Sequence, residues 1–101
     1  MAVGAGPGGA VEQGFRAGTR RVGAMDPRVE TGGDRALAGR GSLGRDVGLM
    51  VDSHGTFSLP EAKRFARLVE GAGLRWFEEP TPLDDPTAAA ELRASTDIPI
   101  A

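Results

Sequence analysis

The pattern of apolar and polar residues is clearest in the second half of the chain. An apolar run at residues 47–51 ends at Asp52 and Gly55, and its length is typical of a buried parallel strand. Ser58 is a favourable helix N-cap, and Glu61 three residues later completes a capping box. The sequence therefore predicts a strand that passes through a short loop into a helix.

The predicted helix has one apolar face. Apolar residues recur at steps of three and four, which places them on one side: Ala62, Phe65, Ala66 and Val69. Charged residues take the other side: Lys63, Arg64, Arg67 and Glu70. Because Lys63 is the single lysine of the chain and is expected to point to solvent, a lysine base or Schiff base is not favoured.

A second strand and a second helix follow. Two glycines end the first helix, and residues 74–77 form another short apolar run. Asp85 is placed to cap the next helix, with Pro86 at its first position. Residues 98–101 are predicted to begin a third strand.

The first half of the chain gives weaker signals. We interpret residues 1–9 as a flexible start, residues 10–17 as a short helix and residues 20–24 as a weak strand. Residues 31–44 mix glycine, alanine and arginine without a sustained apolar period, so helix propensity there is poor.

Carboxylates follow both of the predicted apolar strands. Strands that alternate with helices in units of about 25 residues predict right-handed crossovers and a parallel sheet. Asp52 ends the first strand, and Glu78 with Glu79 ends the second. Adjacent strands lie about 4.8 Å apart, so carboxylates at equivalent strand ends can share one hard divalent cation such as Mg²⁺.

Length and composition narrow the possible functions. With 101 residues the chain is too short for a complete barrel of about 250 residues, so any large α/β enzyme is represented here only in part. It has no cysteine, which leaves carboxylates and the single His54 as candidate ligands or bases. A net charge of -2 and the lack of an apolar run of roughly 18 residues argue against nucleic-acid and membrane partners. We expect a cytoplasmic protein.

Three segments of the chain are similar to a known protein family. They are "LMVDSHGTFSLPEAKRF", "LRWFEEPTPLDD" and the closing "DIPIA". Together they resemble the C-terminal barrel domain of the enolase superfamily, in its mandelate racemase and muconate lactonizing enzyme branch. This resemblance covers residues 14–101, after a flexible, glycine-rich start at residues 1–13. It implies an α/β fold, a partial (β/α) TIM-type barrel of roughly three parallel strands with intervening helices.

The resemblance also implies roles for the residues at the strand ends. Asp52 and Glu78 match the first two Mg²⁺ ligands of the family, and Glu79 would lie just outside the ligand set. In the family this ion binds the substrate carboxylate and stabilises the enediolate that forms when a base removes the neighbouring proton. His54 is similar to the general acid of galactonate- and mannonate-type dehydratases, which helps a hydroxyl leave as water. The implied protein is a magnesium-dependent sugar-acid dehydratase, from a family that is typically homo-oligomeric.

The chain departs from the family pattern at one possible base. Many members carry a Lys-x-Lys pair on the second barrel strand, and the equivalent positions here are Thr19 and Arg21. Arginine keeps its proton near neutral pH, so a base on that strand is not expected. The third metal ligand and the later base positions of the family are not part of this chain.

Two other interpretations stay open. The start "MAVGAGPGG" contains a Gly-x-Gly-x-x-Gly pattern, followed by "AVEQGF" and Asp26, which outlines a dinucleotide fingerprint. Only three residues precede these glycines, which is short for the required strand. The other interpretation is an inactive, truncated remnant, because a slice of a barrel leaves open sheet edges and uncovered apolar surface.

Overall fold

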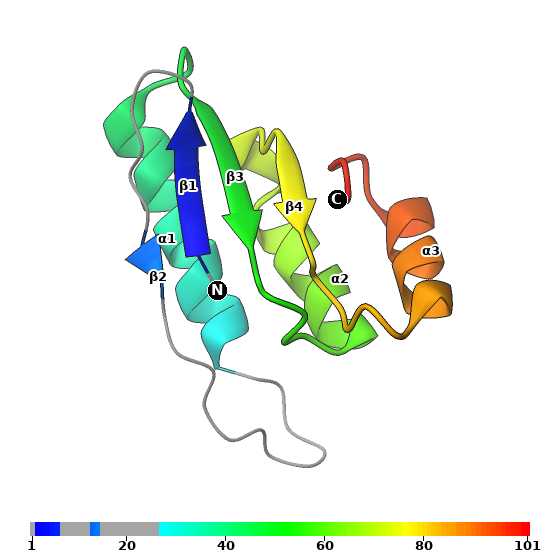
Figure 1. Cartoon of the computed structure of the whole chain (residues 1–101). Helices are drawn as coiled ribbons and strands as arrows, with labels where there is room; N and C mark the ends of the chain where they lie inside the picture. Colours follow the sequence, from blue (N-terminus) through cyan, green and yellow to red (C-terminus); the bar gives the residue numbers. More distant parts are fainter. Residues whose placement is uncertain (1, 7–12, 15–26) are drawn as a thin grey trace.

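The computed structural model describes residues 2–6, 13–14 and 27–101 (Figure 1). The elements in chain order are β1 (Ala2–Gly6), β2 (Gln13–Gly14), α1 (Arg28–Leu43), β3 (Gly48–Asp52), α2 (Leu59–Leu68), the 3-10 helix η1 (Glu70–Ala72), β4 (Trp76–Glu78) and α3 (Pro86–Ser95). The alternation of strand and helix from β3 to α3 confirms the order predicted for the second half of the sequence.

The strands form one sheet in the order β2-β1-β3-β4. β3 and β4 are parallel, with Met50 opposite Trp76 and Asp52 opposite Glu78. Beyond β4, Ile100 forms a single parallel bridge with Phe77, so the predicted third strand is represented by one bridge. In Figure 1, α1 and α2 lie behind this sheet.

The beginning of the chain contains a strand where a flexible segment was expected. β1 pairs antiparallel with β3 along the whole of both strands, from Ala2 opposite Asp52 to Gly6 opposite Gly48. The prediction of a flexible start is wrong for these residues, because the edge of β3 offers backbone groups that an extended segment can pair with.

The predicted helix at residues 10–17 is wrong at Gln13 and Gly14. These two residues form β2, which pairs antiparallel with β1. A two-residue strand depends on its partner for its hydrogen bonds, and the local sequence carries no signal for it. The rest of that predicted helix, the predicted strand at residues 20–24, and Thr19 and Arg21 lie outside the described residues.

α1 forms in a segment whose helix propensity is poor. Its buried side consists of Val29, Gly32, Gly33 and Ala36. A Cβ atom on Gly33 would lie 3.4 Å from the side chain of Leu68 in α2, so the small residues let the two helices approach closely. Tertiary packing of this face therefore overrides the weak local propensity.

The core lies between the sheet and the helices. Burial alternates along β3 and β4, and Leu49, Val51 and Phe77 point towards the helices. The ring of Phe77 packs 4.8 Å from that of Phe65 and 6.4 Å from that of Phe57, measured between centroids. Within the described part of the chain, no helix is both long and apolar enough to cross a membrane.

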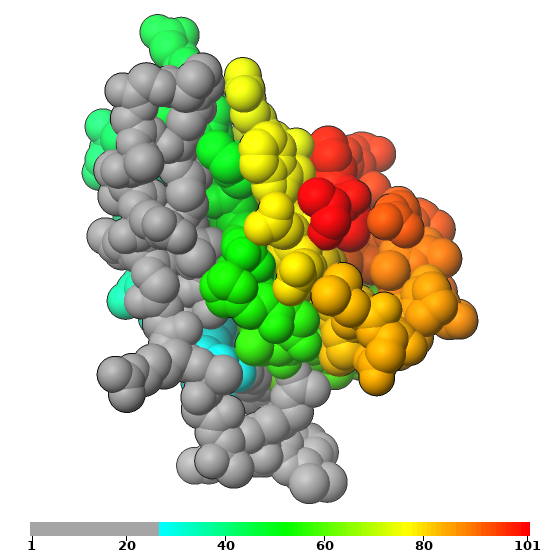
Figure 2. Space-filling view, in the orientation of Figure 1, coloured from blue at the N-terminus to red at the C-terminus, as the bar shows by residue number. Residues whose placement is uncertain are grey.

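Among the described residues, the helices leave the other face of the sheet free. Met50 and Trp76 are half-buried there, and by strand alternation Asp52 and Glu78 share that face. Figure 2 views the molecule from this side, with β4 in yellow next to the end of the chain in red. The amide of Ala101 donates to the carbonyl of Phe77 at 3.0 Å, which holds these two segments together.

The predicted helix caps are both present. Ser58 Oγ accepts from the Glu61 amide at 3.3 Å, and Glu61 Oε1 accepts from the Ser58 amide at 2.8 Å. Asp85 Oδ1 accepts from the Ala88 amide at 3.0 Å at the start of α3. Lys63 lies on the outer side of α2, where its Nζ is 3.3 Å from Glu91.

Candidate metal centre at the strand ends

Two carboxylates meet at the carboxyl ends of the parallel strands. Asp52 is the last residue of β3, Glu78 is the last residue of β4, and the two are opposite each other in the strand register. Neighbouring strands are about 4.8 Å apart, so both side chains reach the same space. The structure thus brings together the pair that the sequence placed at equivalent strand ends.

The proximity of Asp52 changes the pKa of the Glu78 carboxyl. Its pKa is raised above the ordinary value of 4.5, mainly by a hydrogen bond with Asp52 and by the negative charge of Asp52. Partial burial and the charge of Glu79 raise the pKa further, and His54 lowers it. Like charges are therefore held close together, which is the situation that a bound cation relieves.

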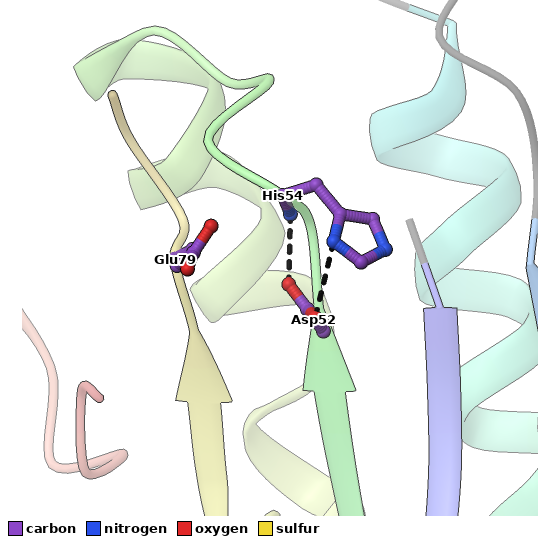
Figure 3. A group of neighbouring side chains, drawn as sticks. All are labelled: Asp52, His54 and Glu79. Carbon is purple, nitrogen blue, oxygen red and sulfur yellow. Dashed lines mark hydrogen bonds and ion pairs between the residues drawn. The ribbon is translucent and has the colours of Figure 1, made fainter. Parts of the chain in front are cut away.

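His54 contacts both oxygens of Asp52. Its amide donates to Oδ1 at 2.8 Å, and its ring Nδ1 lies 3.2 Å from Oδ2. The side chain of His54 is 62% exposed, against 25% for Asp52, and its other ring nitrogen points away from Asp52 (Figure 3). One nitrogen therefore orients the ring while the other can reach solvent or a substrate.

Glu79 joins Asp52 and His54 in a compact group. Each of the three offers one ligand atom, and these atoms lie within 4.8 Å of one another (Figure 3). Strand alternation alone would turn Glu79 to the face opposite Glu78. The backbone of Glu79 has a φ of 44°, in the left-handed region that residues other than glycine rarely adopt, and this breaks the alternation.

The loop after β3 holds the segment after β4. The amides of Ser53, Gly55 and Phe57 donate to the carbonyls of Glu78, Glu79 and Pro80 at 3.1, 2.6 and 3.2 Å respectively. Ser53 Oγ lies 2.7 Å from the carbonyl oxygen of Glu79. Sequence reasoning missed Ser53, since a serine at a strand end carries no signal until its burial is known.

The donor set suits a hard divalent cation. Asp52 and Glu78 offer carboxylate oxygens, which Mg²⁺ prefers, from adjacent strand ends, and Glu79 brings a further carboxylate oxygen within 4.8 Å of a ligand atom of Asp52. The imidazole of His54 is a ligand more typical of transition metals. The residues present therefore fit the Mg²⁺ expected from the sequence, with His54 in a role other than ligand.

The dinucleotide interpretation does not fit the described residues. Gly4 and Gly6 lie inside β1, although the fingerprint needs its glycines in the turn that follows a strand. Gln13 and Gly14, placed in the expected helix, form β2 instead. Gly9, the last glycine of the pattern, lies outside the described residues.

Comparison with known proteins decides the family. Residues 8–101 match the model of the family described as Enolase C-terminal domain-like. The chain belongs to this family. The resemblance that the sequence motifs indicated is confirmed.

Curated relatives of this enolase-like chain are sugar-acid enzymes. Arabinonate dehydratase of Saccharolobus solfataricus is 32% identical over 91 residues, which are 90% of this chain and 24% of that protein. Two other relatives are a D-galactarolactone cycloisomerase and a 3,6-anhydro-α-L-galactonate cycloisomerase. The chain spans between 16% and 24% of the length of these three curated relatives.

Solved structures share the fold of this chain. A mandelate racemase/muconate lactonizing enzyme-like protein from Rubrobacter xylanophilus has a TM-score of 0.70 and 46% identity, covering 77% of this chain and 20% of that protein. L-talarate dehydratase from Polaromonas, complexed with Mg and L-glucarate, has a TM-score of 0.69 and 35% identity, covering 76% of this chain and 22% of that protein. The predicted fold class, a partial (β/α) TIM-type barrel, is confirmed.

Proposed function

We propose that this chain is a part of a magnesium-dependent sugar-acid dehydratase, a hydro-lyase that removes the proton next to a substrate carboxylate and eliminates water. One observation carries the proposal: Asp52 and Glu78 lie opposite each other at the ends of adjacent parallel strands, where Asp52 raises the pKa of Glu78. The dehydratases among the relatives support the reaction class. A homo-oligomeric assembly of the whole protein belongs to the same proposal.

The carboxylates at the strand ends would hold the Mg²⁺. Asp52 and Glu78 supply oxygen ligands from β3 and β4, and Glu79 adds negative charge beside them. The bound ion would hold the substrate carboxylate and offset the negative charge that develops next to it. Asp52 is held in place for this task by the amide and the ring of His54.

His54 would act as the general acid. Its Nδ1 faces Asp52 and its other ring nitrogen points away, so a protonated His54 can give a proton from the outward nitrogen to the leaving hydroxyl. The carbon–oxygen bond then breaks, and the hydroxyl departs as water. The exposure of the ring leaves room for a substrate to approach.

Calorimetric titration with Mg²⁺ tests the metal site. We expect Asp52→Asn and Glu78→Gln each to weaken Mg²⁺ binding by at least about tenfold, because each removes one charged ligand from a small set. Glu70→Gln is the matched control, since Glu70 is exposed in η1. An identical response of the wild type and Asp52→Asn would contradict the proposed site.

A further inference from the structure

We propose that the hydroxyl of Ser53 positions Glu79 beside Asp52 and His54, and so sets the shape of the candidate metal centre. Ser53 is therefore a positioning residue, which acts through the backbone of its neighbour and does not contact the metal or the substrate. The part of this inference that concerns Mg²⁺ rests on the proposed function. The part that concerns the conformation of Glu79 does not.

Ser53 is a buried polar residue between a half-buried residue and an exposed one. None of its surface is accessible, although it stands between Asp52 and His54 in the sequence. Its Oγ lies 2.7 Å from the Glu79 carbonyl oxygen and 3.2 Å from the Pro80 carbonyl oxygen. A buried hydroxyl is costly without a partner, so the side chain favours a conformation of the neighbouring segment that brings these carbonyls to it.

The backbone of Glu79 needs such support. Its φ of 44° is unfavourable for a residue with a side chain and persists only where the surroundings enforce it. Two donors converge on its carbonyl oxygen: Ser53 Oγ at 2.7 Å and the Gly55 amide at 2.6 Å. Loss of one donor removes one of the two hydrogen bonds that keep the φ of Glu79 positive.

The orientation of this carbonyl decides where the carboxylate lies. The peptide before Glu79 is fixed, because the Glu78 carbonyl accepts from the Ser53 amide at 3.1 Å and the Glu79 amide donates to the Ala101 carbonyl at 2.9 Å. The φ of Glu79 therefore sets the direction of its carbonyl and of its side chain together. With φ positive, the carboxylate joins the ligand atoms of Asp52 and His54 within 4.8 Å. With an ordinary strand φ, it would turn towards the opposite face of the sheet.

A simple packing role makes a different prediction. If Ser53 only fills space, Ser53→Ala changes stability slightly and leaves Glu79 in place. If the hydroxyl positions Glu79, Ser53→Ala changes the backbone there, and Ser53→Thr, which keeps a hydroxyl, restores it. Ser95→Ala is the matched control, because Ser95 Oγ donates to the Leu92 carbonyl at 2.8 Å in α3, away from the site.

The first measurement needs no metal. Nuclear magnetic resonance of the 101-residue chain with a chelator reports the φ of Glu79 through its amide–Hα coupling and its Cα and Cβ shifts. We expect a positive φ in the wild type, Ser53→Thr and Ser95→Ala, and a shift towards negative φ in Ser53→Ala. A positive φ retained in Ser53→Ala overturns the inference. If Ser53→Ala does not fold, loss of the positive φ in a folded Ser53→Thr overturns it as well.

The second measurement is calorimetric titration with Mg²⁺. We expect Ser53→Ala to weaken Mg²⁺ binding by about tenfold, because a displaced Glu79 no longer places its negative charge beside the ligands, and Ser53→Thr to recover most of the binding. If Ser53→Ala binds Mg²⁺ as the wild type does while Asp52→Asn binds it more weakly, the role of Ser53 in the metal centre is overturned and the proposed metal site stands. If the wild type and Asp52→Asn respond alike, the proposed function fails, and the resonance measurement still decides the role of Ser53.

Discussion

Asp52 faces Glu78 across the ends of two parallel strands, and the Asp52 carboxylate raises the pKa of the Glu78 carboxyl. The backbone register places the two residues opposite each other, so their carboxyl groups stay near each other while β3 and β4 are paired. A proton or a cation relieves the repulsion between them. The same relationship therefore links the metal affinity of the site to the stability of the fold.

The stability of the metal-free chain should depend on the protonation of Glu78. The folded pKa of Glu78 lies above the ordinary value of 4.5, so the folded state binds this proton more tightly than the unfolded state does. The stabilisation that this tighter proton binding gives to the folded state is fully present below pH 4.5 and is lost as pH rises through the raised pKa. Urea denaturation with a chelator, at a series of pH values, should show this loss in the wild type.

Glu78→Gln should remove this part of the pH dependence, because glutamine carries no charge at any pH. The free energy of unfolding of the variant minus that of the wild type should grow as pH rises above 4.5. Glu70→Gln, on the exposed 3-10 helix, should leave the profile unchanged. Parallel profiles for the wild type and Glu78→Gln would show that Asp52 and Glu78 do not interact in solution.

The 101-residue chain by itself should not turn over sugar acids in the presence of Mg²⁺. It spans between 16% and 24% of the three curated relatives compared above, and in the described residues the helices leave uncovered the face of the sheet that carries Met50 and Trp76. Product formation from a panel of aldonic acids is the measurement, with the arabinonate dehydratase of Saccharolobus solfataricus as the positive control. Turnover by the chain that Asp52→Asn abolishes would contradict this prediction.

Arg40 should be important for the stability of the fold. From α1 its guanidinium donates to the carbonyls of Ala72 at 2.6 Å, Gly44 at 2.6 Å, Val47 at 2.7 Å and Gly73 at 3.3 Å. These bonds join the end of α1 to the segment that leads into β3 and to the turn between η1 and β4. Hydrogen bonds to charged groups contribute about 1.5–3 kcal/mol, but two of these four are exposed to solvent and bonds from one side chain are not additive. We therefore expect Arg40→Ala to lower the free energy of unfolding by on the order of 2–4 kcal/mol.

Arg40→Lys should recover little of this loss, because an ammonium group cannot reproduce the planar fork of donors. Arg45→Ala, at an exposed position, should change the free energy of unfolding by less than about 0.5 kcal/mol. Urea denaturation followed by circular dichroism measures all three variants. An Arg40→Ala variant as stable as Arg45→Ala would mean that these bonds contribute nothing net.

The capping box of α2 should contribute measurably to stability. Ser58→Ala removes the acceptor of the Glu61 amide, and we expect a loss of about 1 kcal/mol in the free energy of unfolding. Ser42→Ala, exposed in the last turn of α1, should leave stability nearly unchanged. Thermal denaturation of both variants tests this, and equal midpoints would count against the cap.

Much of the candidate site could be predicted from short-range signals. The apolar run before Asp52, the cap at Ser58 and the apolar run before Glu78 each depend on residues close in sequence, and the structure bears them out. The roles of Asp52 and Glu78 as ligands and of His54 as an acid remain predictions. The position of Glu79 within the group could not be predicted, because it depends on a φ of 44° that residues of another loop enforce.

The sequence by itself determined the alternation of strands and helices from β3 to α3, the caps of α2 and α3 and the position of Asp52 and Glu78 at equivalent strand ends. These features follow from caps and from apolar periods that act over a few residues. Only the tertiary structure decided that the weak helical segment forms α1, that Ala2–Gly6 pairs with β3, and that Ser53 holds the carbonyl of Glu79. Each of these depends on a partner far away in the sequence: the surface of α2, the edge of β3 or a buried carbonyl. Local propensity cannot encode such contacts, because their free energy appears only when the elements pack together.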